Sequence, residues 1–117
     1  MTDRELLELE AKAAGIEITW ALMGDTYAAW LPNELLWNPL EDDGDALRLA
    51  VLLRFWVKDF APYEGFNGEQ PFGMIEIWRE TDDDPIYVEW YKPGEDRITV
   101  TRRAIVLAAA ETGKNLK

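Results

Sequence analysis

The spacing of apolar residues changes several times along the chain and predicts eight elements of secondary structure. Apolar residues that recur every three to four positions indicate helices, and apolar residues that alternate with polar ones indicate strands. Helices are predicted to begin at Thr2, at Asp42 or Asp43, and at Thr99 or Thr101. Strands are predicted at residues 16–22, 27–31, 55–60, 72–80 and 86–91. The predicted order is therefore α-β-β-α-β-β-β-α.

Polar residues and glycines mark where the helices begin and end. Thr2, followed three residues later by Glu5, forms a capping-box pattern for the first helix, and Gly15 is well placed to end it. The acids at residues 42–45 suit the start of the second helix, because Asp caps the free N–H groups and complements the helix dipole. Gly113 is expected to end the last helix.

The connections between successive strands are short, which favours antiparallel pairing, and three helices need at least one sheet face to cover. We therefore expect an α+β layered fold: three helices and a mainly antiparallel five-stranded sheet. The chain has 117 residues, of which 48% are hydrophobic, so it can bury a core of its own. A single domain over residues 1–117 is predicted.

The composition excludes several kinds of chemistry. The chain has no Cys, which removes disulfides, a thiolate nucleophile and Cys-ligated zinc. It also has no His, the commonest general base and the commonest transition-metal ligand. We expect no catalytic residues, no metal site and no cofactor, and the protein is not expected to be an enzyme.

The charge balance restricts the partners. With 12 Lys and Arg against 23 Asp and Glu, the net charge is −11, which disfavours direct binding of nucleic acid or of an anionic membrane. No stretch approaches the roughly 18–20 apolar residues of a membrane span. Residues 1–5 show neither the basic nor the apolar region of a secretion signal. A cytoplasmic location is the resulting expectation.

Three segments carry a family resemblance: MTDRELL at residues 1–7, WNPLEDDGDALRLAV at 37–51 and TRRAIVLAAA at 101–110. Together they resemble small phage- and prophage-encoded proteins, in particular the family described as the phage ABA sandwich domain. The resemblance implies an α/β/α-type sandwich and a phage or prophage origin, which would place the protein in the bacterial host. It implies no catalytic residues.

Two acidic clusters are candidate binding sites. The first matches no calcium-loop spacing, so helix capping is its structural explanation, and a turn accounts for the second, which Pro85 follows. The functional alternative is that both meet a basic surface on another protein. The residues concerned are Glu41, Asp42, Asp43, Asp45, Asp82, Asp83 and Asp84.

Six Trp in so short a chain suggest both core filling and a contact surface. Trp20 is expected in the core, because it shares its strand face with Ile18 and Leu22. Trp78 and Trp90 lie on strands that should pair, and Tyr91 lies on the opposite face from Trp90. If both faces of this hairpin are aromatic, one is exposed and adhesive. Trp78, Trp90 and Tyr91 are therefore the candidate apolar anchors.

Two function classes follow. In the first, the acidic protein is a binding module that occupies a basic surface of a host nucleic-acid-handling defence protein, as inhibitors of the anti-CRISPR or anti-restriction type do. In the second, it is an accessory or structural phage protein without enzymatic activity, which can form a homo-oligomer and whose charge keeps it soluble. An enzyme acting through carboxylates, Tyr or Lys is the third and least supported class.

Overall fold

The computed structural model describes residues 2–60, 73–79, 82–92 and 94–116. In these residues the predicted order α-β-β-α-β-β-β-α is confirmed, and all strand pairs are antiparallel. Phe72 and Glu80, the two ends of the predicted strand 72–80, lie outside the described residues. The helices are α1 (Asp3–Ala14), α2 (Asp43–Leu52) and α3 (Arg97–Lys114); the strands are β1 (Thr19–Met23), β2 (Thr26–Trp30), β3 (Phe55–Phe60), β4 (Gly73–Arg79) and β5 (Tyr87–Tyr91).

The predicted caps of α1 and α2 are confirmed. The Thr2 hydroxyl accepts a hydrogen bond from the Glu5 backbone N–H at 3.1 Å and donates one to the Glu5 carboxylate at 3.0 Å. Gly15 ends α1 in the left-handed conformation, at a φ of 69°. At α2 the N-cap is Asp42, whose carboxylate accepts from the Asp45 N–H at 2.8 Å.

Both predicted ends of α3 are wrong. Its N-cap is Asp96, whose carboxylate accepts hydrogen bonds from the Ile98 N–H and from the Thr99 hydroxyl. These hydrogen bonds, that from Thr99 first, lower the pKa of Asp96. Gly113 lies inside the helix and does not end it. Its missing side chain makes room for α1, because a Cβ on this residue would stand 2.1 Å from the Leu9 carbonyl oxygen. The glycine lets α3 lie directly against α1.

The predicted single five-stranded sheet is also wrong. The strands form two sheets: a hairpin of β1 and β2, and a three-stranded sheet in the order β3-β4-β5. The chain after β2 turns back along that strand. Leu36 forms a bridge with Trp30, and the Trp37 N–H donates to the Ala29 carbonyl at 3.0 Å. The place beside β2 is therefore taken by its own connection, and α2 then carries the chain away before β3 begins.

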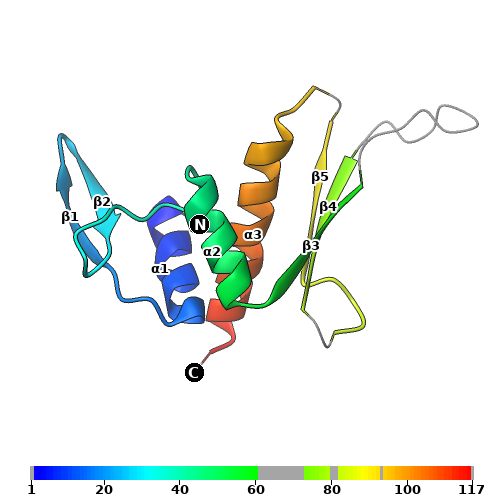
Figure 1. Cartoon of the computed structure of the whole chain (residues 1–117), viewed down its shortest axis with the longest axis horizontal. Helices are drawn as coiled ribbons and strands as arrows, with labels where there is room; N and C mark the ends of the chain where they lie inside the picture. Colours follow the sequence, from blue (N-terminus) through cyan, green and yellow to red (C-terminus); the bar gives the residue numbers. More distant parts are fainter. Residues whose placement is uncertain (1, 61–72, 80–81, 93, 117) are drawn as a thin grey trace, which may run out of the picture.

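The helices lie between the two sheets (Figure 1), and they cover the three-stranded sheet on one side only. α3 contacts β4 and β5, α2 contacts β3, and α1 packs behind them on α3. Within the described residues no helix covers the opposite face of β3-β4-β5. The α/β/α sandwich that the resemblance implied is therefore not the arrangement found.

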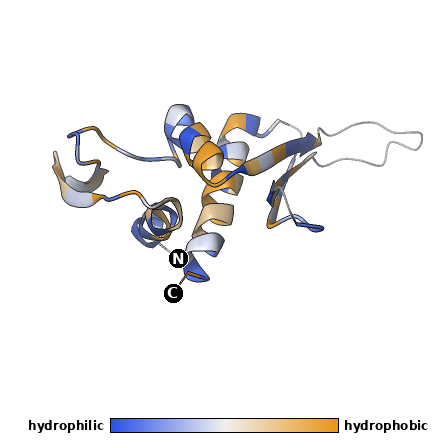
Figure 2. Ribbon diagram, turned by 60° about the horizontal axis from the view of Figure 1, so that its bottom comes forward, coloured by the Kyte–Doolittle hydropathy of each residue, from blue (hydrophilic) through white to orange (hydrophobic). Residues whose placement is uncertain are grey.

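The core lies between α2, α3 and the covered face of the three-stranded sheet, where hydrophobic residues line the facing elements (Figure 2). Leu49 from α2, Ile75 and Ile77 from β4, and Ala104 and Ala108 from α3 are completely buried. Small alanines on α3 allow the helix to approach the sheet closely, which suits the dense packing of protein interiors.

Trp20 was expected in the core but is only half-buried at the edge of it. The guanidinium of Arg4 lies over its ring, 4.6 Å from the ring centre. Its strand neighbour Leu22 is exposed, because β1 extends away from the helices (Figure 1).

Candidate functional site

The uncovered side of β3-β4-β5, which we call the outer sheet face, collects aromatic residues from all three strands. The register places Trp56 opposite Trp78, Lys58 opposite Glu76, and Met74 opposite both Phe60 and Trp90. Because side chains alternate between the faces of a sheet, these residues share one side. The outer sheet face consists of Trp56, Lys58, Phe60, Met74, Glu76, Trp78, Val88 and Trp90.

Three large side chains of the outer sheet face are about half exposed: Trp56 at 53%, Phe60 at 46% and Trp90 at 58%. Scattered exposed apolar residues are ordinary, but a group of aromatic ones on a single sheet face is typical of an interaction site. Trp in particular is enriched among the residues that dominate binding energy in protein interfaces.

Trp78 is the best fixed of these aromatic residues. The Lys58 ammonium lies over its ring at 4.4 Å from the ring centre, and its indole N–H donates to the Glu76 carboxylate at 3.1 Å. Lys58 and Glu76 also face each other across β3 and β4, so their charges balance within the face. The centre of the outer sheet face is consequently neutral, although the chain carries a charge of −11.

The opposite face of the sheet holds these strands in place. Tyr91 is buried, with only 2% of its surface exposed, and its hydroxyl donates to the Asp59 carboxylate at 2.9 Å. Arg97 pairs with the same carboxylate. The Tyr91 ring lies over Gly73, where a Cβ would stand 2.1 Å from it. Tyr91, a predicted anchor, therefore belongs to the core and offers a partner no surface, whereas Trp90 is exposed.

The first acidic cluster acts mainly as a helix start. Asp45 is only 7% exposed and accepts hydrogen bonds from the Asn38 N–H at 2.9 Å and from Arg48 at 3.2 Å. Asp42 is the cap, and Asp43 pairs with Arg102, which also donates to the Leu40 carbonyl at 2.9 Å. The capping interpretation is confirmed, and Glu41 is the exposed acid of this cluster for which the described residues show no partner.

The second acidic cluster is more open. Asp82, Asp83 and Asp84 are all exposed, and Asp82 lies 3.4 Å from the Arg79 guanidinium. Among the described residues, Asp83 and Asp84 form no ion pair or side-chain hydrogen bond. The cluster follows β4, so it flanks the end of the outer sheet face where Trp56 and Trp78 lie. Its acids and those aromatic residues can meet one partner.

The two acidic clusters do not lie together. Asp43 begins α2, and the chain runs down the length of that helix before β3 starts beside Arg79. A helix of ten residues spans about 15 Å, and Figure 1 shows the start of α2 towards the top of the molecule and the segment between β4 and β5 at the lower right. Only the Asp82–Asp84 cluster borders the outer sheet face.

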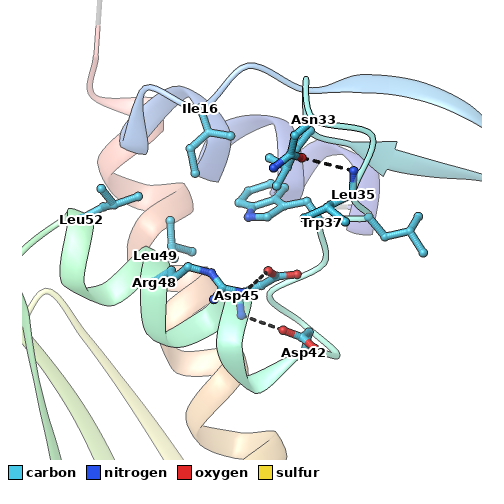
Figure 3. Close-up of a pocket in the computed structure, with 11 residues that line it drawn as sticks. Ile16, Asn33, Leu35, Trp37, Asp42, Asp45, Arg48, Leu49 and Leu52 are labelled. Atoms are coloured by element: carbon cyan, nitrogen blue, oxygen red, sulfur yellow. Dashed lines mark hydrogen bonds and ion pairs between the residues drawn. The ribbon is translucent and has the colours of Figure 1, made fainter.

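A cavity of about 610 Å³ separates α2 from the connection that follows β2 (Figure 3). Trp37, Leu49 and Leu52 give it apolar walls, and Asp42 and Asp45 are its acids. Both carboxylates already accept hydrogen bonds that shape the helix start, as the dashed lines in Figure 3 show. Both carboxylates are therefore held in place by their partners at the start of α2.

The described part of the chain contains no group of three or more Asp and Glu close enough to hold a metal ion. Its helices also include none that is long and apolar enough to cross a membrane. The feature that these residues do present is the group of exposed aromatic side chains on the outer sheet face.

Comparison with known proteins returned no matching family model, no similar curated protein and no similar solved structure. The resemblance to the phage ABA sandwich domain thus stays a hypothesis.

Sequence reasoning did not single out Trp56 and Phe60, which the structure shows exposed on the outer sheet face. The signal was present, because Trp56, Lys58 and Phe60 alternate with residues of the covered face along β3. Alternation alone does not tell which of the two faces the helices cover, and an apolar residue on either face satisfies the same pattern.

Proposed function

We propose that the protein is a non-enzymatic binding module of phage or prophage origin that inhibits a host nucleic-acid-handling defence protein of the CRISPR or restriction type. It occupies a basic surface on that protein, in the cytoplasm of the bacterial host, and binds no nucleic acid or membrane itself. The observation that carries the proposal is the outer sheet face, on which Trp56, Phe60 and Trp90 are about half exposed and whose Trp56 end borders an acidic turn.

Aromatic side chains and acids have separate tasks in this proposal. Trp56 and Trp90 supply apolar area and the affinity that comes from desolvation. The Asp82–Asp84 cluster and the net charge of −11 steer the encounter with a basic surface and compete there with nucleic acid. Asp42 and Asp45 are left out of the contact, because the start of α2 uses both carboxylates.

The host-protein class rests on the resemblance of residues 37–51 to phage proteins and on the acidic charge. A surface that binds nucleic acid is basic, and an acidic protein that covers it blocks access without any chemistry. No cofactor or metal is needed for this inhibition.

The test is capture from a defence-bearing bacterial lysate with the purified protein as bait, at low and at high salt. A nucleic-acid-handling protein should be retained at low salt and released at high salt. Trp90→Ala should weaken its binding at least about tenfold, as expected for an interface hot spot. Retention by the Trp90→Ala and Trp56→Ala variants at wild-type strength would exclude the outer sheet face.

A matched pair of triple variants tests the acidic turn. Asp82→Asn, Asp83→Asn and Asp84→Asn together remove three charges next to the outer sheet face. Glu17→Gln, Asp25→Asn and Glu34→Gln remove three exposed charges near the hairpin. Only the first set should weaken retention of the captured protein. If both sets weaken retention equally, the turn contributes through the net charge of the protein alone and not through its position.

A second candidate function is that of an accessory or structural phage protein that self-associates. The observation that favours it is the β1–β2 hairpin, in which Leu22 and Tyr27 are exposed at 61% and 62%. The two candidates use different surfaces, so both can be tested in the same chain.

A further inference from the structure

The β1–β2 hairpin is stabilised poorly by the rest of the molecule. It stands apart from the three-stranded sheet (Figure 1), and its strand residues Leu22, Met23 and Tyr27 are all about half exposed or more. A two-stranded hairpin is only marginally stable in water unless a third strand or a helix packs against it. Beyond the bridge of Leu36 to Trp30 at its base, no further strand pairs with this hairpin among the described residues.

The two edges of the hairpin differ. The outer edge of β2 is partly covered, since Trp30 forms a bridge with Leu36 and the Leu31 N–H donates to the Leu35 carbonyl at 2.8 Å. In the described residues β1 pairs with β2 alone. Its other edge therefore presents unpaired backbone groups, which are a template for another strand.

The open edge also lacks the usual protection. Natural edge strands carry charges, especially Lys, or proline or a bulge that prevents pairing with another chain. Thr19–Met23 and Thr26–Trp30 contain no charged residue, no Pro and no Gly. Within residues 18–33 the single charge is Asp25, although 30% of the whole chain is charged. Figure 2 shows the hairpin strands mainly in pale and orange shades.

We infer that a second copy of this chain docks on the open edge of β1, strand against strand. A two-fold axis sets β1 antiparallel to its own copy, so the same edge serves both partners and the contact closes as a dimer. The result is one four-stranded sheet in the order β2-β1-β1-β2. Three or more strands give the hairpin the stability it lacks alone.

Charge explains why a second copy fits this edge. Two molecules with a charge of −11 repel each other wherever their acids meet, so they can approach only through an uncharged surface. Residues 18–24 form such a stretch. A basic partner finds acids only beyond the two ends of this stretch, at Glu17 and Asp25, and none along residues 18–24.

This inference rests on the second candidate function, and it concerns a surface separate from the outer sheet face. The experiment must therefore report on β1 directly. The natural chain has no Cys, so a single introduced Cys can form a disulfide only with another copy. Neighbouring strands lie about 4.8 Å apart, whereas two copies of β2 in the four-stranded sheet lie three spacings, or about 14 Å, apart. A disulfide needs Cα atoms within about 7 Å.

The test compares Trp20→Cys, Ala21→Cys and Leu22→Cys on β1 with Tyr27→Cys on β2 under mild oxidation. The β1 variant whose position lies on the two-fold axis should form a covalent dimer quickly, and Tyr27→Cys should stay monomeric. Cross-linking of Tyr27→Cys as fast as the β1 variants, or of none of the four, overturns the inference.

Sedimentation equilibrium of the full chain gives an independent readout. Leu22→Lys should weaken dimerisation at least about tenfold, because each copy then brings a charge to the shared edge. Tyr27→Lys is the matched control, since Tyr27 lies opposite Leu22 and is almost equally exposed, but belongs to β2, the outer strand of the four-stranded sheet. A wild-type chain that stays monomeric at high concentration overturns the inference, as does a dimer that both variants leave intact. Trp90→Ala should not change dimerisation, so failure here is distinct from failure of partner binding.

Discussion

Glu10 is a carboxyl group placed completely inside the fold, and neither of its oxygens has a hydrogen-bond partner among the described residues. Burial raises its pKa to about 9 from an ordinary value of 4.5. The folded protein therefore keeps the proton on Glu10 at neutral pH. An ionised carboxylate at this place would be a charge without any partner, which is strongly unfavourable.

This proton links stability to pH. Between pH 4.5 and pH 9 the folded state holds a proton that the unfolded chain has released, so the free energy of unfolding falls as pH rises. The expected slope approaches about 1.4 kcal/mol per pH unit. Below pH 4.5 Glu10 is protonated in both the folded and the unfolded state, so it no longer makes the free energy of unfolding depend on pH. Urea unfolding at several pH values between 5 and 8.5 measures the slope.

Glu10→Gln should flatten that slope, since it replaces the protonated acid by a neutral group of the same shape. Glu8→Gln is the control, because Glu8 lies on the same helix but is exposed. A slope that persists in Glu10→Gln, or that Glu8→Gln removes equally, would assign the pH dependence to other groups.

The contact between Tyr91 and Gly73 predicts a second residue-level effect. Gly73→Ala should destabilise the fold by about 2 kcal/mol or more, because the new methyl group would collide with the Tyr91 ring. Tyr91→Phe keeps the ring and loses only the hydrogen bond to Asp59, so it should cost about 1 kcal/mol. Chemical denaturation of both variants gives the comparison. A larger loss for Tyr91→Phe than for Gly73→Ala would contradict this account of the packing.

At the scale of elements, the sequence predicted those helix ends that depend on interactions between neighbouring residues. The capping box at Thr2 and the αL glycine at Gly15 act within a few residues, and both are found. The start of α3 was missed, because Asp96 and Thr99 are both capping residues and only the fold shows that they act together. The division into two sheets depends on how residues 35–37 return along β2, which no periodicity within a strand reveals.

The contact of Gly113 with α1 predicts how a substitution there changes the stability of the fold. Ala is the better helix former by about 1 kcal/mol, so on an isolated helix Gly113→Ala would stabilise. Here the added Cβ meets the Leu9 backbone, which cannot move without shifting α1, and we expect a net loss of about 2–4 kcal/mol. Gly44→Ala in α2 is the matched control, because its nearest contact is the flexible end of Arg48 at 3.1 Å. Denaturation midpoints should fall for Gly113→Ala alone.

At the scale of the whole molecule, the sequence predicted the charge but not its distribution. The helix start uses Asp42 and Asp45, and the second cluster flanks the outer sheet face. Period-two alternation correctly put Trp90 and Tyr91 on opposite faces. Which face the helices cover follows from contacts of α2 and α3 with β3 to β5, and those contacts join residues far apart in the chain. The sequence therefore named Trp90 as a candidate but could not tell which face of β3-β4-β5 is exposed.

The net charge of −11 gives the two proposed contacts opposite responses to salt. Screening lengths fall from about 10 Å at 0.1 M salt to about 3 Å at 1 M. Binding to a basic partner draws on attraction, so its dissociation constant should rise as salt is added. Self-association through the uncharged edge of β1 works against repulsion between two acidic molecules, so its dissociation constant should fall over the same range. Sedimentation of the protein alone and with its captured partner measures both trends. Self-association that weakens with salt would require attraction between charged groups, and this contradicts a contact through residues 18–24.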